Sequence, residues 1–304
     1  MILERLTKSL DQAGYKFSVF SIDHLQTAEE EFKSLPENGL IDESFYKNAL
    51  GFNFDSQNIP KSSKSVFIVA MPHYPSKITF TSNQKDIVVV LPPQYAYPAL
   101  EEKVSNLFKE VLSEKCISIN PVRLPLKYLA AMSGLCRIGR NNLCYMRSSG
   151  SFLRLTGFVT DLEINNSQWT GLSQLKNCKN CSLCAENCPT KAIDKNRYLI
   201  HAQNCLTYFN ETADQIPKWV NPQWHNSIVG CMKCQIICPY NRKNKDFIEF
   251  NMSFDEVETE KILHREPYEN LDQETQKKIY QLGLTEYYDV LPRNLSLLIE
   301  NNKS

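Results

Sequence analysis

The pattern of apolar and polar positions divides the first half of the chain into helices and strands. Residues 2–13, 97–114 and 126–133 carry apolar side chains at helical spacing, and the last of these segments stops at Gly134. Four short apolar runs predict strands, at 16–22, 65–71, 87–91 and 116–119. Helices that alternate with strands are typical of a layered α/β domain.

The pattern changes near residue 175. Cysteines, prolines and polar residues replace the regular periodicity, which fits a small domain organised around inorganic cores. From Asp246 helical patterning returns, at 254–263, 272–282 and 291–301. We therefore expect an α/β (α+β) domain at 1–170, a ferredoxin-like domain at 171–245, and a short helical segment at 246–304 that packs on the core.

Composition excludes several classes of protein. The chain has 304 residues, with 34 Lys and Arg against 34 Asp and Glu, so its formal net charge is zero. That balance lacks the basic excess of a nucleic-acid binder. No apolar run approaches the ~18 residues of a membrane span. The first fourteen residues mix charged and apolar positions, unlike a signal peptide, so we expect a cytoplasmic protein whose cysteines stay reduced.

Eight of the eleven cysteines fall into or between two tight runs. The first run is Cys178-x2-Cys181-x2-Cys184-x3-Cys188-Pro189, and the second is Cys231-x2-Cys234-x3-Cys238-Pro239. Three thiolates of such a run can wrap one 4Fe–4S cubane, while the cysteine before proline ligates the other cluster. This spacing predicts two clusters.

The same rule assigns the ligands. One cluster receives Cys178, Cys181, Cys184 and Cys238, and the other receives Cys188, Cys231 and Cys234, with the lone Cys205 as its fourth ligand. Structural zinc is the alternative interpretation of paired CxxC motifs. However, the four cysteines of the first run are too closely spaced to suit a single tetrahedral zinc ion. Zinc ribbons also have no second run that ends in its own Cys-Pro.

The segment 178–242 resembles the double-cluster domain of the epoxyqueuosine reductases. The similar elements are CKNCSLCAENCPTKAI, HAQNCLTYFNE and GCMKCQIICPYNR. Upstream, GLCRIGRN at 134–141 is similar to the family's GLGWIGKN, and GSFLRLTGFVTD at 150–161 to its GSWFFLGEILTD. With PRNLSLLIEN at 292–301, the resemblance covers residues 65–302.

The resemblance implies a cobalamin-dependent reductase. In that family two 4Fe–4S clusters pass electrons to base-off cobalamin, which reduces an epoxide on a transfer RNA nucleoside, and reductive dehalogenases share this plan. Electrons would come from a ferredoxin or flavodoxin. By resemblance, Arg137, Gly139, Arg140 and Cys144 stand near the cofactor.

Three departures from the family pattern affect the expected chemistry. Asn120 stands where the family keeps a proton-donating aspartate, and an amide cannot deliver that proton. Tyr97 or Tyr95 would then be the donor, although packing roles are the alternative for both. Arg137 replaces an aromatic residue. The helical-repeat extension that many members use on transfer RNA does not follow, which weighs against a tRNA substrate.

Further residues have two interpretations each. The three cysteines outside the cluster set can be small buried hydrophobic residues, at Cys116, Cys136 and Cys144. For Cys136 and Cys144 the alternative is a thiol that approaches cobalt or substrate. The arginines at 137, 140, 147 and 154 are either surface cations or contacts to an anionic or amide-rich ligand. His73 follows an apolar strand, where sites gather. His201 and His225 border the cysteines as supporting residues rather than ligands.

The leading hypothesis is an iron–sulfur, cobalamin-dependent reductase that acts on a small molecule or nucleoside. One alternative is a non-catalytic electron carrier that reduces the corrinoid of a partner. The other is a cluster protein that has lost cobalamin.

Overall fold

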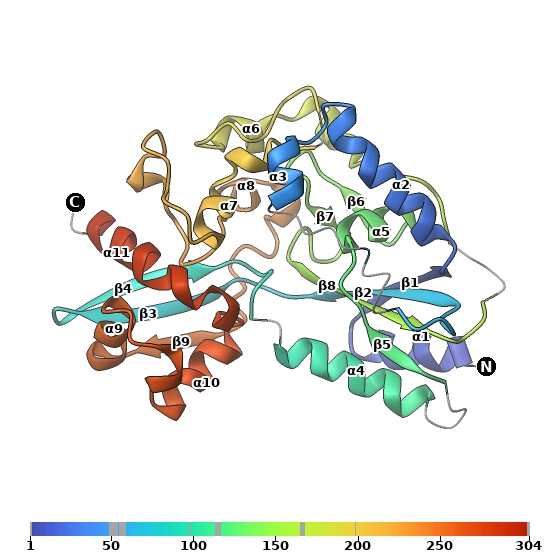
Figure 1. Cartoon of the computed structure of the whole chain (residues 1–304), viewed down its shortest axis with the longest axis horizontal. Coiled ribbons are helices and arrows are strands. Elements are labelled where there is room, and N and C mark those ends of the chain that lie inside the picture. Colours follow the sequence, from blue (N-terminus) through green and yellow to red (C-terminus); the bar gives the residue numbers. More distant parts are fainter. Residues whose placement is uncertain are drawn as a thin grey trace. The chain divides into compact units, whose positions relative to one another are not determined.

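The computed structural model describes residues 2–48, 54, 59–96, 98–112, 117–164, 168–197 and 199–302. Two compact units interleave along the chain (Figure 1). The first unit comprises residues 1–72, 100–181 and 194–202, and the second comprises 73–99, 182–193 and 203–304. Each unit has its own sheet and its own core.

The first unit is built on a four-stranded sheet. Its strands are β1 (Lys16–Ser21), β2 (Ser65–Pro72), β8 (Leu153–Thr160) and β5 (Ile119–Pro121). They lie in the order β1-β2-β8-β5, and every neighbouring pair is antiparallel. Strand β2 is buried along almost its whole length, which explains its uninterrupted apolar run.

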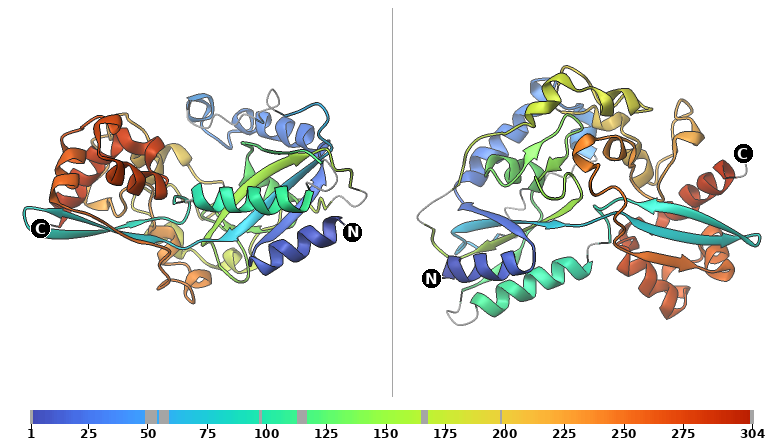
Figure 2. Two further views of the ribbon diagram at one scale, coloured as in Figure 1. Left: turned by 90° about the horizontal axis from the view of Figure 1, so that it is seen from below. Right: turned by 180° about the vertical axis from the view of Figure 1, so that it is seen from behind.

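Helices cover both faces of this sheet (Figure 2). Helices α1 (Ile2–Gln12) and α4 (Pro98–Leu112) pack on one face, where Phe108 is fully buried against Phe67 and Phe158. Helices α2 (His24–Glu37) and α5 (Leu126–Met132) pack on the other. Burial of a phenylalanine contributes about 1.5–3 kcal/mol, so Phe108 fixes α4 firmly.

Smaller elements complete the first unit. Helix α3 (Glu43–Asn48) follows α2. A two-stranded hairpin, β6 (Arg137–Ile138) and β7 (Cys144–Tyr145), follows α5. The 3-10 helix η2 (Lys176–Asn180) carries the first cysteine of the first run.

The second unit contains a three-stranded sheet of order β4-β3-β9. Its strands are β3 (Ser76–Ser82), β4 (Lys85–Leu91) and β9 (Asn251–Phe254), with β9 parallel to β3. Helices α9 (Glu256–Leu263), α10 (Gln273–Gln281) and α11 (Leu291–Asn301) share its core with the turn η7 (Thr285–Val290). Asp255 and Glu258 form a reciprocal capping box that starts α9.

Short helices carry the cysteine runs in the second unit. They are α6 (Leu183–Asn187), α7 (Leu206–Glu211) and α8 (Lys233–Ile236), with the 3-10 turns η3 (Ala202–Asn204), η4 (Pro222–Trp224) and η5 (Pro239–Asn241). A further 3-10 turn, η6 (Tyr268–Asn270), lies between α9 and α10. None of these helices exceeds two turns, so helix propensity alone does not stabilise them and they depend on tertiary contacts.

Most predicted elements are confirmed. The helices expected at 2–13, 97–114 and 126–133 are α1, α4 and α5, and the three C-terminal helices are α9, α10 and α11. The layered α/β prediction is confirmed in its α+β form, because the central sheet is antiparallel. Helix α2 and strands β3, β8 and β9 were not predicted. The division at residues 170 and 245 stays a prediction, and Cys116 and Tyr97 lie outside the described residues.

In the described part of the chain, no helix has both the length and the apolar character needed to cross a bilayer.

Candidate iron–sulfur centre

Two short helices of the second unit bring parts of both cysteine runs together. Helix α6 contains Cys184, α8 contains Cys234, and the two helices pack against each other. The side-chain amide of Asn187 donates a 2.7 Å hydrogen bond to the carbonyl oxygen of Lys233. This bond ties the end of α6, next to Cys188, to the start of α8.

Cys205 lies close to thiols of both runs. Burial raises the pKa of Cys205 to about 11, and the neighbouring Cys231 and Cys188 thiols contribute to the increase. Cys188 also contributes to the raised pKa of Cys231, whose main cause is burial. Three of the four thiols predicted for the second cluster are therefore electrostatic neighbours. The assignment of Cys205 as the eighth ligand stays a prediction that this proximity supports.

A polar side chain holds one of these thiols. The Nδ2 atom of Asn226 donates to Sγ of Cys231 across 3.3 Å and to the carbonyl oxygen of Trp224 across 3.0 Å. Its Oδ1 atom accepts a 2.9 Å bond from the amide of Met232. Asn226 therefore fixes the backbone around Cys231 and directs an N–H at its sulfur. Sequence reasoning missed this residue, because nothing in its five-residue spacing from Cys231 marks it.

The first two cysteines of the first run belong to the first unit, where Arg140 holds their backbone. Arg140 is only 6% exposed. Its Nε donates to the carbonyl oxygen of Cys181 across 3.0 Å, and its two terminal nitrogens donate to the carbonyl oxygens of Cys178 and Lys195. The guanidinium fork thus holds two carbonyl oxygens of the loop at 178–181, called the cysteine loop below, and a third at Lys195.

The hairpin that presents Arg140 requires glycine at the preceding position. A Cβ atom on Gly139 would lie 2.5 Å from Cε2 of Tyr145 and 2.8 Å from Oδ1 of Asn141. The Tyr145 hydroxyl in turn accepts a 2.9 Å hydrogen bond from Nδ2 of Asn141. Gly139 therefore permits the tight turn that aims Arg140 at the cysteine loop.

The sulfur atoms of the described cysteines are free thiols, at positions 136, 144, 178, 181, 184, 188, 205, 231, 234 and 238. No three His, Cys, Asp or Glu side chains among the described residues are grouped to hold a single metal ion. In a cubane each ligand instead binds a different iron. Three observations fit a thiolate-bound cluster: the thiols are free, Cys205 lies near Cys188 and Cys231, and Asn226 donates an N–H to the Cys231 sulfur.

The remaining predicted site residues of the first unit lie on the edge strand β5 and on the hairpin of β6 and β7. Asn120 is a partly exposed residue of the edge strand β5, opposite Val159. Arg137 is exposed on β6. Cys144 is buried on β7, with its Sγ 2.7 Å from Sγ of Cys136. The catalytic role of Asn120 and the cofactor-binding roles of Arg137, Gly139, Arg140 and Cys144 stay predictions.

Tyr95 and His73 form a buried polar group in the second unit. The Tyr95 hydroxyl donates to a carboxylate oxygen of Glu211, and burial followed by the Glu211 charge raises the pKa of Tyr95 well above its ordinary value. His73 contacts the Tyr95 carbonyl oxygen through Nε2 at 3.0 Å and Glu249 through Nδ1 at 3.3 Å. Tyr95 is therefore a weak acid already bound to a partner.

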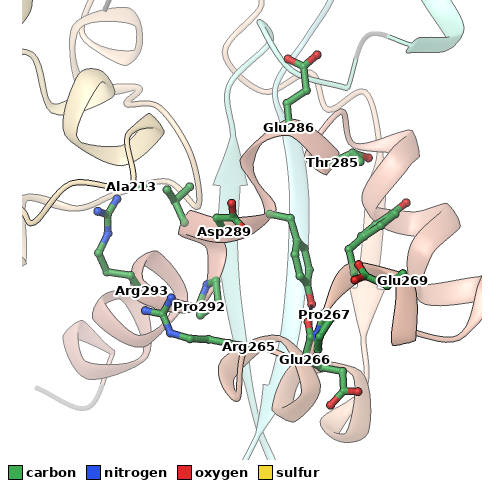
Figure 3. Close-up of a pocket in the computed structure, with 13 residues that line it drawn as sticks. Ala213, Arg265, Glu266, Pro267, Glu269, Thr285, Glu286, Asp289, Pro292 and Arg293 are labelled. Atoms are coloured by element: carbon green, nitrogen blue, oxygen red, sulfur yellow. Dashed lines mark hydrogen bonds between the residues drawn. The ribbon is translucent and has the colours of Figure 1, made fainter. Parts of the chain in front are cut away.

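A pocket of ≈ 510 Å³ opens beside the C-terminal helices of the second unit (Figure 3). Arg265 and Arg293 lie near each other on one side, and the positive charge of Arg265 adds to burial in lowering the pKa of Arg293. Arg293 already donates to the carbonyl oxygens of Phe209 and Asp214. The pocket contains none of the predicted site residues, so its side chains carry no role in the chemistry considered below.

Comparison with known proteins agrees with this centre. Residues 177–241 match the family described as "4Fe-4S double cluster binding domain". The epoxyqueuosine reductase of Cellulophaga algicola is 25% identical over 265 residues, which are 84% of this chain and 83% of that protein. Other relatives match over less of their length, and the chain spans 48% of the Escherichia coli epoxyqueuosine reductase.

Solved structures show the same fold. The epoxyqueuosine reductase of Streptococcus thermophilus superposes with a TM-score of 0.66 at 20% identity, over 99% of this chain and 81% of that one. An epoxyqueuosine reductase solved with an epoxyqueuosine-modified tRNA stem loop gives 0.63 at 18% identity, over 100% and 83%. The predicted resemblance is confirmed, the chain carries a double 4Fe–4S domain, and the matches support an iron–sulfur reductase.

Proposed function

We propose that this chain is a cobalamin-dependent iron–sulfur reductase that has diverged from the epoxyqueuosine reductases in its substrate chemistry. The observation that carries the proposal is the match of residues 177–241 to a double-cluster domain, in which Cys188, Cys205 and Cys231 are electrostatic neighbours. When bound, the clusters and the corrinoid supply one-electron transfer and a strongly reducing centre. The protein supplies binding, orientation and protons.

Cobalamin binding is supported by the resemblance of 134–161 to the family's cofactor-facing stretch. The exposed guanidinium of Arg137 is suited to the polar periphery of a corrinoid. Arg140 is less suited, because each of its three guanidinium nitrogens already donates to a backbone carbonyl oxygen, at Cys178, Cys181 and Lys195. We therefore assign Arg137 to the corrinoid and Arg140 to the cluster loop. The expected mode is base-off, since the sequence has no DxHxxG-type histidine motif.

The substrate is proposed to differ from that of the family because of proton supply. Asn120 cannot act as a carboxylic acid, and the Tyr95 hydroxyl is bound to Glu211 with a raised pKa. Tyr97 is left as the candidate donor. A nucleoside in transfer RNA remains a possible substrate class, since one relative of this fold is known with an epoxyqueuosine-modified stem loop. A zero net charge favours a small molecule or free nucleoside instead.

The test is anaerobic purification with and without added cobalamin. The protein should contain about eight iron and about eight sulfide per chain, as two cubanes require. About two zinc without sulfide would contradict the cluster assignment. Titration with cob(II)alamin should saturate below roughly 100 μM, which corresponds to about −5.5 kcal/mol. Binding that does not saturate in this range would favour a cluster protein without corrinoid.

Electron delivery separates the proposal from its main rival. A reduced ferredoxin or flavodoxin should reduce both clusters and support turnover of an added substrate. If the loaded protein instead reduced the corrinoid of a separate partner and turned over no substrate of its own, it would be an electron carrier.

A further inference from the structure

Two cysteines that the cluster assignment leaves unused lie in contact inside the first unit. Sγ of Cys136 is 2.7 Å from Sγ of Cys144, closer than the ~3.5–4.0 Å at which smaller carbon atoms pack. Both residues are buried, with exposed fractions of 3% and 4%. Both thiols are free. The fold therefore places the two sulfur atoms in contact while both are still reduced thiols.

The hairpin register brings the pair together. Ile138 on β6 is directly opposite Cys144 on β7. Cys136 lies one residue before β6, and its Sγ reaches Sγ of Cys144 beside the Ile138–Cys144 pair. The amide of Cys136 also donates a 3.1 Å bond to the carbonyl oxygen of Ala130, which anchors it to α5. Cross-strand anchoring holds both sulfurs in place.

The environment protects the reduced pair. The hydrogen bond to Cys144 and burial raise the pKa of the Cys136 thiol, so the thiolate that reacts with any oxidant is scarce and the pair reacts slowly. Apolar side chains surround both residues, including Leu129, Ile138 and Leu155. An oxidant that reaches the pair must be small, which favours a peroxide over glutathione disulfide.

We propose that Cys136 and Cys144 are a disulfide site that closes when the protein meets hydrogen peroxide. The two thiols lose two electrons and two protons, and one sulfur–sulfur bond forms. The peroxide oxygen–oxygen bond breaks, and its two oxygens leave as water. Movement is small, because a disulfide bond of about 2.05 Å replaces an existing contact. This site does not depend on the proposed cobalamin or substrate.

Closure would cross-link the segment that aims Arg140 at the cluster loop. Gly139 and Arg140 both lie between the two cysteines in sequence. A disulfide would fix the ends of this turn, while the hydrogen bonds of Arg140 to the carbonyls of Cys178 and Cys181 join it to two predicted ligands. The oxidised pair is thus expected to preserve, rather than disrupt, the loop of the first cluster.

Tryptic peptides give a direct test. Cleavage after Lys127, Arg137, Arg140 and Arg147 places the two cysteines alone in separate peptides, residues 128–137 and 141–147. The anaerobic protein with its clusters is treated with a small excess of hydrogen peroxide, alkylated and digested. We expect the two peptides linked, lighter by two hydrogens than their sum, and separated again by dithiothreitol. The cluster absorbance is followed in the same samples.

Two variants serve as controls. Cys144→Ser should abolish the linked peptide, while Cys116→Ser, at the third cysteine outside the cluster set, should retain it. The proposal is overturned if the two peptides are found alkylated or separately oxidised to sulfinic acid under peroxide. It is also overturned if Cys136 links instead to a cysteine of the cluster set while the cluster absorbance is unchanged.

Discussion

The side-chain amide of Asn226 donates a hydrogen bond to the sulfur of Cys231 across 3.3 Å. Hydrogen bonds to cluster sulfurs stabilise the more negative, reduced state and so raise the reduction potential. Asn226→Asp keeps the acceptor for the amide of Met232 but removes the N–H. A hydrogen bond to a charged group contributes about 1.5 kcal/mol. Because this bond is present in both oxidation states and only strengthens on reduction, the potential of the second cluster should fall by less than roughly 60 mV.

Potentiometric titration followed by electron paramagnetic resonance measures this shift. The matched control is Asn221→Asp, because Asn221 caps η4 through its side-chain oxygen and donates to no cysteine in the described residues. It adds the same charge in the same segment. Equal shifts in both variants would show that charge alone, and not the N–H···S bond, sets the potential.

Cys205 is expected to ligate the second cluster. Cys205→Ser should therefore remove or distort only the cluster built on Cys188, Cys231 and Cys234, with iron falling from about eight toward about four per chain. The reciprocal variant is Cys178→Ser, which should affect only the other cluster. Iron analysis and the resonance spectra of the two variants distinguish the clusters. Two unaltered clusters in Cys205→Ser would remove it from the ligand set.

The Arg140 side chain should matter for the first cluster rather than for cobalamin. Arg140→Met leaves two carbonyl oxygens of the cysteine loop and that of Lys195 without their donor, and a buried unsatisfied group costs about 1–3 kcal/mol. We expect loss of the cluster that contains Cys178 and Cys181. Arg140→Lys should retain only part of this cluster's iron, because the lysine ammonium lacks the planar fork of the guanidinium.

Arg137→Met is the matched control from the same hairpin. Its exposed side chain should leave the iron content unchanged and weaken cobalamin binding. The opposite result, with full iron in Arg140→Met and loss in Arg137→Met, would reverse the two assignments.

Gly230 should be irreplaceable next to Cys231. Its φ is +76°, and an added Cβ would lie 2.8 Å from the Tyr95 hydroxyl and 3.1 Å from Cγ of Pro92. Gly230→Ala therefore combines a left-handed backbone cost of about 1–2 kcal/mol with overpacking of about 1–3 kcal/mol. Gly14 has the same φ, with no atom within 4 Å of an added Cβ.

Thermal or denaturant unfolding compares the two alanine variants. Gly14→Ala should lower the free energy of unfolding only by the backbone cost. Gly230→Ala should lower it by more and should also change the second cluster. Equal losses of stability in the two variants would mean that Tyr95 and Pro92 move away from the added Cβ without destabilising the protein.

The double 4Fe–4S domain could be predicted from sequence because the chemistry of its cysteine runs is local, while the ligand assignment stays a prediction. Three cysteines on one short loop carry a spacing that reflects the size of the cubane. The role of Arg140 could not, because its acceptors lie 38 to 55 residues further along the chain. The resemblance predicted a contact of Arg140 with the cofactor, which stays a prediction, and gave no sign of its hydrogen bonds to Cys178 and Cys181. The Cys136–Cys144 contact could not be predicted for a similar reason, since the pairing of β6 with β7 and the bond of Cys136 to α5 bring the sulfurs together.

Among the secondary elements, α2 escaped prediction because its sequence is polar and contains Pro36. Strand β3 does alternate between buried and more exposed side chains, so its pattern was present in the sequence and was overlooked. The antiparallel order of the central sheet depends on contacts between β2 and β8, some 88 residues apart, which periodicity does not encode.

The last prediction concerns the reaction. Asn120 occupies the position that resembles the family's proton-donating aspartate, on the partly exposed edge strand β5. We expect little or no reduction of epoxyqueuosine in transfer RNA, because general acid catalysis is typically worth ~10²–10⁴-fold. Asn120→Asp restores a carboxylic acid of nearly the same shape and should raise the rate by a comparable factor. Asn120→Ala, which also lacks a carboxyl, is the matched control and should remain as slow as the native chain.

The assay supplies cobalamin, a chemical reductant and epoxyqueuosine-containing transfer RNA, and measures queuosine formed per chain. Fast turnover by the native chain would show that another group donates the proton. Since the Tyr95 hydroxyl is held by Glu211, Tyr97→Phe would then identify whether the neighbouring phenol is that donor. If the native chain and Asn120→Asp were both inactive while both bound cobalamin with equal affinity, the deficit would lie in substrate recognition. A different reducible substrate would then be the one to seek.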